Sequence, residues 1–225
     1  MENAENKTKS GSGYSILYHF VVFVFAIIAK LLFFMRIEGR ENLPSEGAYI
    51  LMGNHQAFLD PATLALCDRK RDMHFMGKKE LFEKPIWNYL FTKVHAFPVD
   101  RGNIDMGAVR TAMGVLKDGN TLGIFPEGTR SHSGHMLPLL GGASLLALKS
   151  GCPVVPVYID GRYRLFQPMH VRIGRPIEME DLRMGRMNKE SCDRLTERMV
   201  AAFAELSEGK SLPPAKEEQK LEENL

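Results

Sequence analysis

A histidine and an aspartate stand five positions apart in the segment Asn54-His55-Gln56-Ala57-Phe58-Leu59-Asp60. On a continuous helix this spacing rotates the two side chains about 140° away from each other, so they meet only if the chain turns between them. Pro61 predicts a helix that begins here, with Asp60 as its N-cap and His55 on the preceding loop. A carboxylate bonded to one imidazole nitrogen leaves the other nitrogen as a base for a substrate proton. The alternative is an ordinary loop histidine beside a helix cap.

A second segment, Phe125-Pro126-Glu127-Gly128-Thr129-Arg130-Ser131, combines a permanent positive charge with a glycine. Arg130 is able to hold a phosphate or carboxylate through two parallel hydrogen bonds, and Gly128 permits unusual backbone dihedrals. Both segments follow apolar runs that are typical of buried strands. We therefore expect them at one edge of a sheet, where α/β folds place their sites. The alternative for the second segment is a surface turn with a solvated arginine.

These two segments resemble conserved blocks of the glycerophosphate and lysophosphatidate acyltransferases of phospholipid synthesis. The first looks like that family's His-x-x-x-x-Asp block and the second like its third block. The segment Ala96-Phe97-Pro98-Val99-Asp100-Arg101-Gly102 is similar to the second block, and Val154-Val155-Pro156-Val157-Tyr158-Ile159-Asp160-Gly161 to the fourth. The four blocks follow the family's order across residues 48 to 161, and the likeness extends to about residue 205.

The resemblance implies an enzyme that moves a fatty acyl group from an acyl thioester to a free hydroxyl of lysophosphatidic acid. Acyl-coenzyme A and acyl-carrier protein both remain open as the donor. His55, oriented by Asp60, is the general base in this hypothesis, which needs no covalent intermediate, metal or further cofactor. The other expected partners are the lysophospholipid acceptor and membrane lipids.

The resemblance also implies the groups that bind substrate. Arg101 and Arg130 would grip the acceptor phosphate together, although Asp100 could instead hold Arg101 in an ion pair. Lys78 and Lys79 match lysines that lie near this phosphate in the family, or they are simply exposed. Glu127, which follows Pro126 and precedes Gly128 and Thr129, would shape the site or bind the glycerol backbone; alternatively it holds its loop through backbone hydrogen bonds.

Two departures from the family pattern leave the acceptor open. His95 stands where the family often has glycine, and the segment 138–142 lacks the lysine of a Pro-Phe-Lys-like run. Another lysophospholipid acceptor is therefore an alternative. A non-catalytic protein that binds anionic lipids and a hydrolase that gives the acyl group to water are competing functions.

Composition sets broader limits. A chain of 225 residues supports one sizeable core, and a formal net charge of +2 gives no general affinity for nucleic acid. Three widely spaced cysteines are expected to be reduced thiols, as in a cytosolic compartment. His132 and His135 share a loop but are too few to predict a zinc site.

The N-terminal region has its own character. Residues 1–13 are polar and expected to be disordered, whereas residues 14–36 are almost entirely apolar and long enough for a helix that crosses a bilayer. Acidic residues before this run and the lack of a cleavage pattern after it disfavour a signal peptide. Either a spanning helix or one lying in the membrane interface remains, with the active site on the cytoplasmic face.

Alternating apolar runs and helical patterns then predict one α/β domain over residues 37–206. Its central sheet is expected to be mixed but mostly parallel and flanked by helices. A charged tail over residues 207–225 shows no core-forming pattern.

Overall fold

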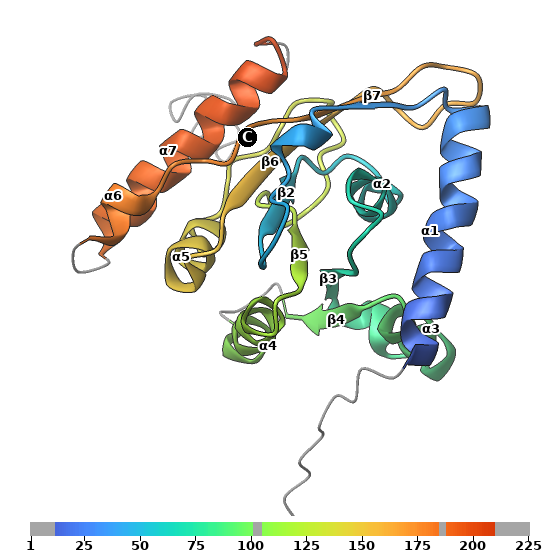
Figure 1. The fold of residues 1–225 in the computed structure, drawn as a ribbon, viewed down its shortest axis with the longest axis horizontal. Coiled ribbons are helices and arrows are strands. Elements are labelled where there is room, and N and C mark those ends of the chain that lie inside the picture. Colours follow the sequence, from blue (N-terminus) through green and yellow to red (C-terminus); the bar gives the residue numbers. More distant parts are fainter. Residues whose placement is uncertain (1–11, 101–104, 185–187, 210–225) are drawn as a thin grey trace, which may run out of the picture.

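The structure is a computed structural model that describes residues 12–100, 105–184 and 188–209. A seven-stranded sheet with the order β1-β7-β6-β2-β5-β3-β4 forms its centre (Figure 1). The strands are β1 (Arg36–Glu38), β2 (Ile50–Gly53), β3 (Met73–Lys78), β4 (Ala96–Val99), β5 (Thr121–Ile124), β6 (Val154–Asp160) and β7 (His170–Ile173).

Within the described residues, strand pairing is parallel throughout the sheet except between β6 and β7. The central strands are buried on both faces, which is why they read as continuous apolar runs rather than as alternating patterns. The expected α/β class with a mixed, mostly parallel sheet is confirmed.

Helices cover both faces of this sheet (Figure 1). They are α1 (Ser12–Leu32), α2 (Asp60–Cys67), α3 (Pro85–Lys93), α4 (Met106–Lys117), α5 (Gly141–Ser150), α6 (Glu180–Arg183) and α7 (Lys189–Leu206), with short 3-10 helices η1 (Arg40–Asn42) and η2 (Lys79–Phe82). Side chains alternate along β2 and the residue before it: Ile50 and Met52 pack with α4, α5 and α7, whereas Tyr49 and Leu51 pack with α1 and α2. The result is a three-layer fold with a hydrophobic core on each side of the sheet.

Helix α1 packs on the sheet through one stripe and leaves the rest of its surface exposed. Tyr18, Val22, Phe25 and Ala29 are buried at helical spacing, while apolar side chains such as Phe20 (62% exposed) face outward. The helix ends at Leu32, earlier than the expected residue 36, because the chain turns at Phe34 (φ 43°) to enter β1. Among the described residues, no helix is both long and apolar enough to cross a membrane.

Some expectations concern residues outside the described part of the chain. They include most of the polar N-terminal segment and charged tail, and also Arg101.

Candidate active site

Three loops meet at one edge of the sheet. Because β2 runs parallel to its neighbours β5 and β6, the carboxyl ends of all three strands point the same way. The chain leaves β2 into α2 on one face and reaches α5 on the opposite face after β5. Adjacent strands whose connections diverge in this way open a crevice, which is where α/β folds bind ligands.

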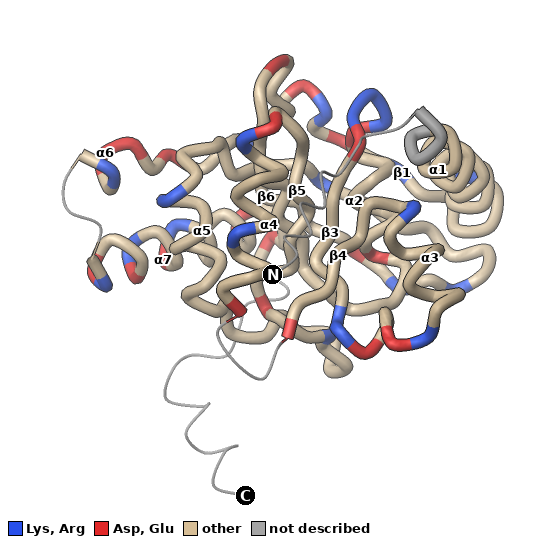
Figure 2. Tube along the Cα trace, turned by 90° about the horizontal axis from the view of Figure 1, so that it is seen from below, with Lys and Arg blue, Asp and Glu red and all other residues tan. Residues whose placement is uncertain are grey.

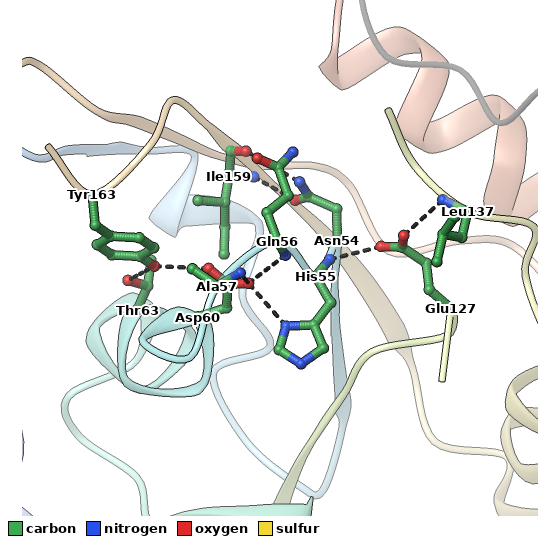
Figure 3. A network of polar contacts seen from close by, with 10 residues as sticks. All are labelled: Asn54, His55, Gln56, Ala57, Asp60, Thr63, Glu127, Leu137, Ile159 and Tyr163. Carbon is green, nitrogen blue, oxygen red and sulfur yellow. Dashed lines mark hydrogen bonds and ion pairs between the residues drawn. The ribbon is translucent and has the colours of Figure 1, made fainter. Parts of the chain in front are cut away.

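His55 and Asp60 form a buried pair at this edge (Figure 3). Nδ1 of His55 lies 2.9 Å from Oδ2 of Asp60, although five residues separate them, because the loop turns before α2 begins. A carboxylate only accepts hydrogen bonds, so Nδ1 carries the proton and Nε2 keeps its lone pair. The ring of His55 also stacks on Phe125, with centroids 4.1 Å apart and planes 21° apart. The imidazole is therefore fixed in tautomer and orientation, as a general base requires.

Asp60 does not act as the expected N-cap. It is the first residue of α2, Leu59 occupies the cap position, and no side chain caps this helix. The Asp60 carboxylate instead turns back, and its Oδ2 accepts the backbone N–H groups of Gln56 and Ala57, each at 2.6 Å. Together with the imidazole these give Oδ2 three donors, which compensate for burying its charge.

Glu127 ties the β5 loop to the histidine loop. Its Oε1 accepts the backbone N–H of His55 and its Oε2 that of Leu137, both at 2.7 Å (Figure 3). Ser131 in turn donates its backbone N–H to the His55 carbonyl at 2.8 Å. Burial raises the pKa of Glu127 to about 7, and Asp60 adds to the rise, although the two backbone donors oppose it. These contacts match the expectation that Glu127 holds its loop through backbone hydrogen bonds.

The other expected binding residues lie in different surroundings. Gly128 has φ 71°, a conformation that strains other residues, and a Cβ there would also displace the end of the Leu140 side chain, so glycine is favoured at this position. Thr129 and Arg130 are exposed beside Ser131. The two lysines are exposed and ion-paired, Lys78 with Glu80 at 3.2 Å and Lys79 with Asp100 at 3.5 Å. The structure thus joins Glu127 to the His55–Asp60 pair and gives the lysines local acidic partners.

The structure adds two groups that the sequence did not single out. Asn54 uses both atoms of its amide group on the backbone of Ile159 in β6, at 3.1 and 2.7 Å. Tyr163, three residues beyond β6, places its hydroxyl 2.9 Å from Oδ1 of Asp60. The apolar run from Pro153 to Ile159 predicted a buried strand, but nothing in the sequence indicated which side chain of the following loop would touch Asp60.

A pocket of about 290 Å³ lies beside the pair and touches all three loops. Its walls consist of polar side chains and backbone atoms, and the permanently charged side chain in the lining, Arg162, is positive. The lining residues are Gln56, Ala57, Ser131, His132, Gly134, Gly161, Arg162 and Tyr163. Since Asp60 receives hydrogen bonds from three of these residues, the pocket adjoins the His55–Asp60 pair on the carboxylate side.

Comparisons with known proteins find relatives that match most of this chain. A family model described as Acyltransferase matches residues 34–160, which include both loops around His55. A 1-acyl-sn-glycerol-3-phosphate acyltransferase from Bacillus subtilis (strain 168) is 31% identical over 195 residues, which cover 84% of this chain and 96% of that relative. An enzyme of the same name from Streptococcus pneumoniae is 31% identical over 175 residues, 75% of this chain and 64% of the relative.

A solved structure shares the fold. The crystal structure of the 1-acyl-sn-glycerophosphate (LPA) acyltransferase PlsC from Thermotoga maritima superposes with a TM-score of 0.64 and 25% sequence identity. The superposition covers 92% of this chain and 86% of that chain. The similarity therefore extends over most of the chain and is not limited to the short blocks at the site.

Proposed function

This chain belongs to the acyltransferase family, and from that membership we propose that it transfers a fatty acyl group from an acyl thioester to the free hydroxyl of 1-acyl-sn-glycerol 3-phosphate. The observation that carries the proposal is the buried contact of 2.9 Å between His55 Nδ1 and Asp60 Oδ2. The product would be phosphatidic acid, and the released thiol would come from coenzyme A or acyl-carrier protein.

In the proposed mechanism, His55 Nε2 removes the proton from the acceptor hydroxyl as its oxygen attacks the thioester carbonyl. The carbon–sulfur bond then breaks and the sulfur leaves with the electron pair. A thiolate is a good leaving group, so the step needs a base and correct positioning more than a strong acid or a covalent intermediate. Asp60 stabilises the imidazolium that forms, and neither a metal nor a further cofactor is needed.

Arg130 is our candidate for the residue that holds the acceptor phosphate, with Arg101 and the two lysines as further basic groups. It is exposed on the loop that Glu127 and Ser131 fasten to His55, so a phosphate held there would keep a constant relation to the base. Replacing Arg130 with alanine should raise the KM for the acceptor about tenfold and leave the KM for the donor nearly unchanged. Arg69→Ala, an exposed arginine just after α2, is the matched control. A selective rise in the donor KM would instead assign Arg130 to the phosphates of the donor.

We further propose that the protein sits on the cytoplasmic face of a membrane through α1 and α3. These helices contact each other and carry few charged residues (Figure 2). Their large exposed apolar side chains include Phe20, Phe23, Ile27, Leu31, Ile86, Trp87 and Tyr89. Such a surface suits a helix that lies in the interface. Full-length protein should co-float with anionic vesicles, and a Phe20→Ser, Phe23→Ser double variant that floats equally well would contradict this attachment.

The decisive test of the function is product analysis. Purified protein is given acyl-coenzyme A or acyl-carrier protein as donor and 1-acyl-sn-glycerol 3-phosphate or an uncharged lysolipid as acceptor. Mass spectrometry should show phosphatidic acid in amounts equal to the thiol released, with much less product from the uncharged lysolipid. Free fatty acid in place of phosphatidic acid would identify a hydrolase. Vesicle binding without thiol release would identify a non-catalytic lipid-binding protein.

A further inference from the structure

Tyr163 reaches the catalytic carboxylate from a different part of the chain. It follows β6, whereas Asp60 follows β2, and the parallel pairing of these strands brings the two residues together across 103 positions. The hydroxyl of Tyr163 lies 2.9 Å from Oδ1 of Asp60 and 2.7 Å from Oγ1 of Thr63 (Figure 3). An edge-to-face contact with Phe33, with ring centroids 5.5 Å apart, holds the tyrosine ring in place.

The direction of these hydrogen bonds follows from counting protons. The Asp60 carboxylate has no proton to donate, so Tyr163 must donate its O–H to Oδ1. The tyrosine oxygen is then free to accept, and Thr63 donates its own hydroxyl proton to it. Burial and the nearby charge of Asp60 raise the pKa of Tyr163, which keeps the phenol protonated. The chain of donors therefore runs from Thr63 through Tyr163 to Asp60.

The two oxygens of Asp60 have separate partners. Oδ2 receives the imidazole and the backbone N–H groups of Gln56 and Ala57, while Oδ1 receives Tyr163. A carboxylate held through both oxygens cannot rotate about its terminal bond without losing one set of contacts. The phenol thus fixes the plane of the carboxylate in which Oδ2 faces His55. It also draws negative charge toward Oδ1 and away from the imidazole.

We propose that Tyr163 is a positioning residue for acyl transfer, acting on His55 through Asp60, with Thr63 orienting its hydroxyl. This role rests on the general-base function proposed above. Tyr163 would keep Nε2 aligned with the acceptor hydroxyl and hold down the basicity of the imidazole. Removing the phenol hydroxyl should therefore impair proton transfer without weakening the binding of either substrate.

Tyr163→Phe tests this directly because it keeps the ring and its contact with Phe33. We expect kcat to fall about tenfold, the KM values for donor and acceptor to stay within about twofold, and the acid limb of the pH profile of kcat/KM to move to higher pH. The shift is upward because a carboxylate without its phenol partner stabilises the imidazolium more strongly.

Tyr49→Phe is the matched control. Tyr49 also donates a buried hydroxyl to an aspartate, Asp68, at 2.7 Å, but Asp68 follows the other end of α2 and is not part of the site. This variant should lose stability in the thermal melt while its kcat and pH profile stay those of the wild type. A purely structural role for Tyr163 would make both tyrosine variants behave alike, and that result would overturn the proposal.

Thr63 provides a graded second measurement. Thr63→Ser keeps the donor and should retain near-normal kcat, whereas Thr63→Val keeps the shape and should lower kcat about threefold. Wild-type kcat and an unmoved pH profile in Tyr163→Phe would refute the positioning role even if His55→Ala is inactive. Activity in His55→Ala would refute the general-base function itself, so the two failures are distinguishable.

Discussion

Two groups of histidines lie at opposite ends of the strands of the same sheet. His55 follows the carboxyl end of β2, whereas His74 lies near the amino end of β3 and His95 directly precedes β4. His74 and His95 stack with centroids 4.7 Å apart, and His95 stacks on Tyr18 of α1 at 5.0 Å. The Nδ1 atoms of both have no hydrogen-bond partner among the described residues, while that of His55 has a carboxylate at 2.9 Å.

The difference shows what separates the proposed base, His55, from a histidine ring that is only packed. Burial, reinforced by His95, lowers the pKa of His74 to about 4, and burial also lowers the pKa of His95 despite nearby Asp72. Oδ2 of Asp72 lies 3.9 Å from Nδ1 of His95, too far for a hydrogen bond. Burial thus disfavours the protonated form of both rings, and the stack of His95 on Tyr18 helps to dock α1 on the sheet. His55 has an oriented carboxylate as well as burial, and only that combination prepares a ring to accept and stabilise a proton.

The largest expected effect is on acyl transfer. His55→Ala should reduce turnover about 10²- to 10⁴-fold, because general-base assistance is lost, while circular dichroism shows an unchanged fold. His74→Phe, which keeps a planar ring in the stack, should retain most of the activity. If the His55→Ala enzyme kept more than about a tenth of normal turnover, His55 would not be the general base, and the proposed difference between it and His74 would be wrong.

The second-largest effect is expected from replacing Asp60, the carboxylate partner of His55. Asp60→Ala removes both the charge and the hydrogen bonds, so its activity should fall nearly as far as that of His55→Ala. Asp60→Asn keeps an oxygen for the imidazole and the two backbone donors but loses the charge that stabilises the imidazolium. Its kcat should lie between those of wild type and Asp60→Ala. Equal kcat values for the two variants would show that charge alone, and not orientation, makes His55 different.

The lowered pKa of His74 should be visible in the pH dependence of the protein's stability. Its pKa is about 4 in the native state against an ordinary 6.5, so between these values the unfolded chain binds a proton that the native chain does not. Wild-type stability should therefore fall as the pH drops from about 6.5 to 4, by at most about 3 kcal/mol from this group. His74→Phe should lose less over the same interval, as measured by urea unfolding.

Comparing wild type with His74→Phe removes the contribution of Glu127, which changes stability with pH in the opposite direction. Glu127, whose pKa is raised to about 7, makes stability fall as pH rises from about 4.5 to 7, and it does so equally in both proteins. If wild type and His74→Phe show the same pH slope, protonation of His74 does not oppose folding, and the proposed contrast with His55 weakens.

The smallest effect concerns the docking of α1. The backbone N–H of Met73 donates to the hydroxyl of Tyr18 at 3.1 Å, next to the stacked histidines. Tyr18→Phe should lower the free energy of unfolding by about 1 kcal/mol and leave kcat with a water-soluble acceptor unchanged. A clear fall in kcat would instead mean that changes at this end of the strands alter the active site.

Several of these features were predictable from the sequence. The four blocks correctly indicated the family, and the apolar runs that end in them indicated an α/β sheet with its loops on one edge. His95 shows how a departure from the family pattern acquires a physical meaning. Its backbone has φ 63°, in the region that favours glycine, which accounts for the glycine that the family often has at this position.

Other features depend on strand order and chain turns that local patterns do not encode. The contact of Tyr163 with Asp60 exists because β6 lies beside β2, and no periodicity along the chain specifies that neighbour. The early end of α1 depends on the left-handed turn at Phe34, within a run that remains apolar up to Met35. The N-cap expected at Asp60 was wrong because its carboxylate finds better donors on the preceding loop than on its own helix.

His55 has both of its main-chain polar groups bonded to the loop that follows β5, through Glu127 and Ser131. These hydrogen bonds hold the two loops in a fixed position relative to each other, although 72 positions separate His55 from Glu127. An insertion of a single residue in either loop would pull the imidazole out of register with whatever the other loop holds. Homologous chains should consequently vary freely in the helices and tails while the lengths of these two loops stay fixed relative to each other.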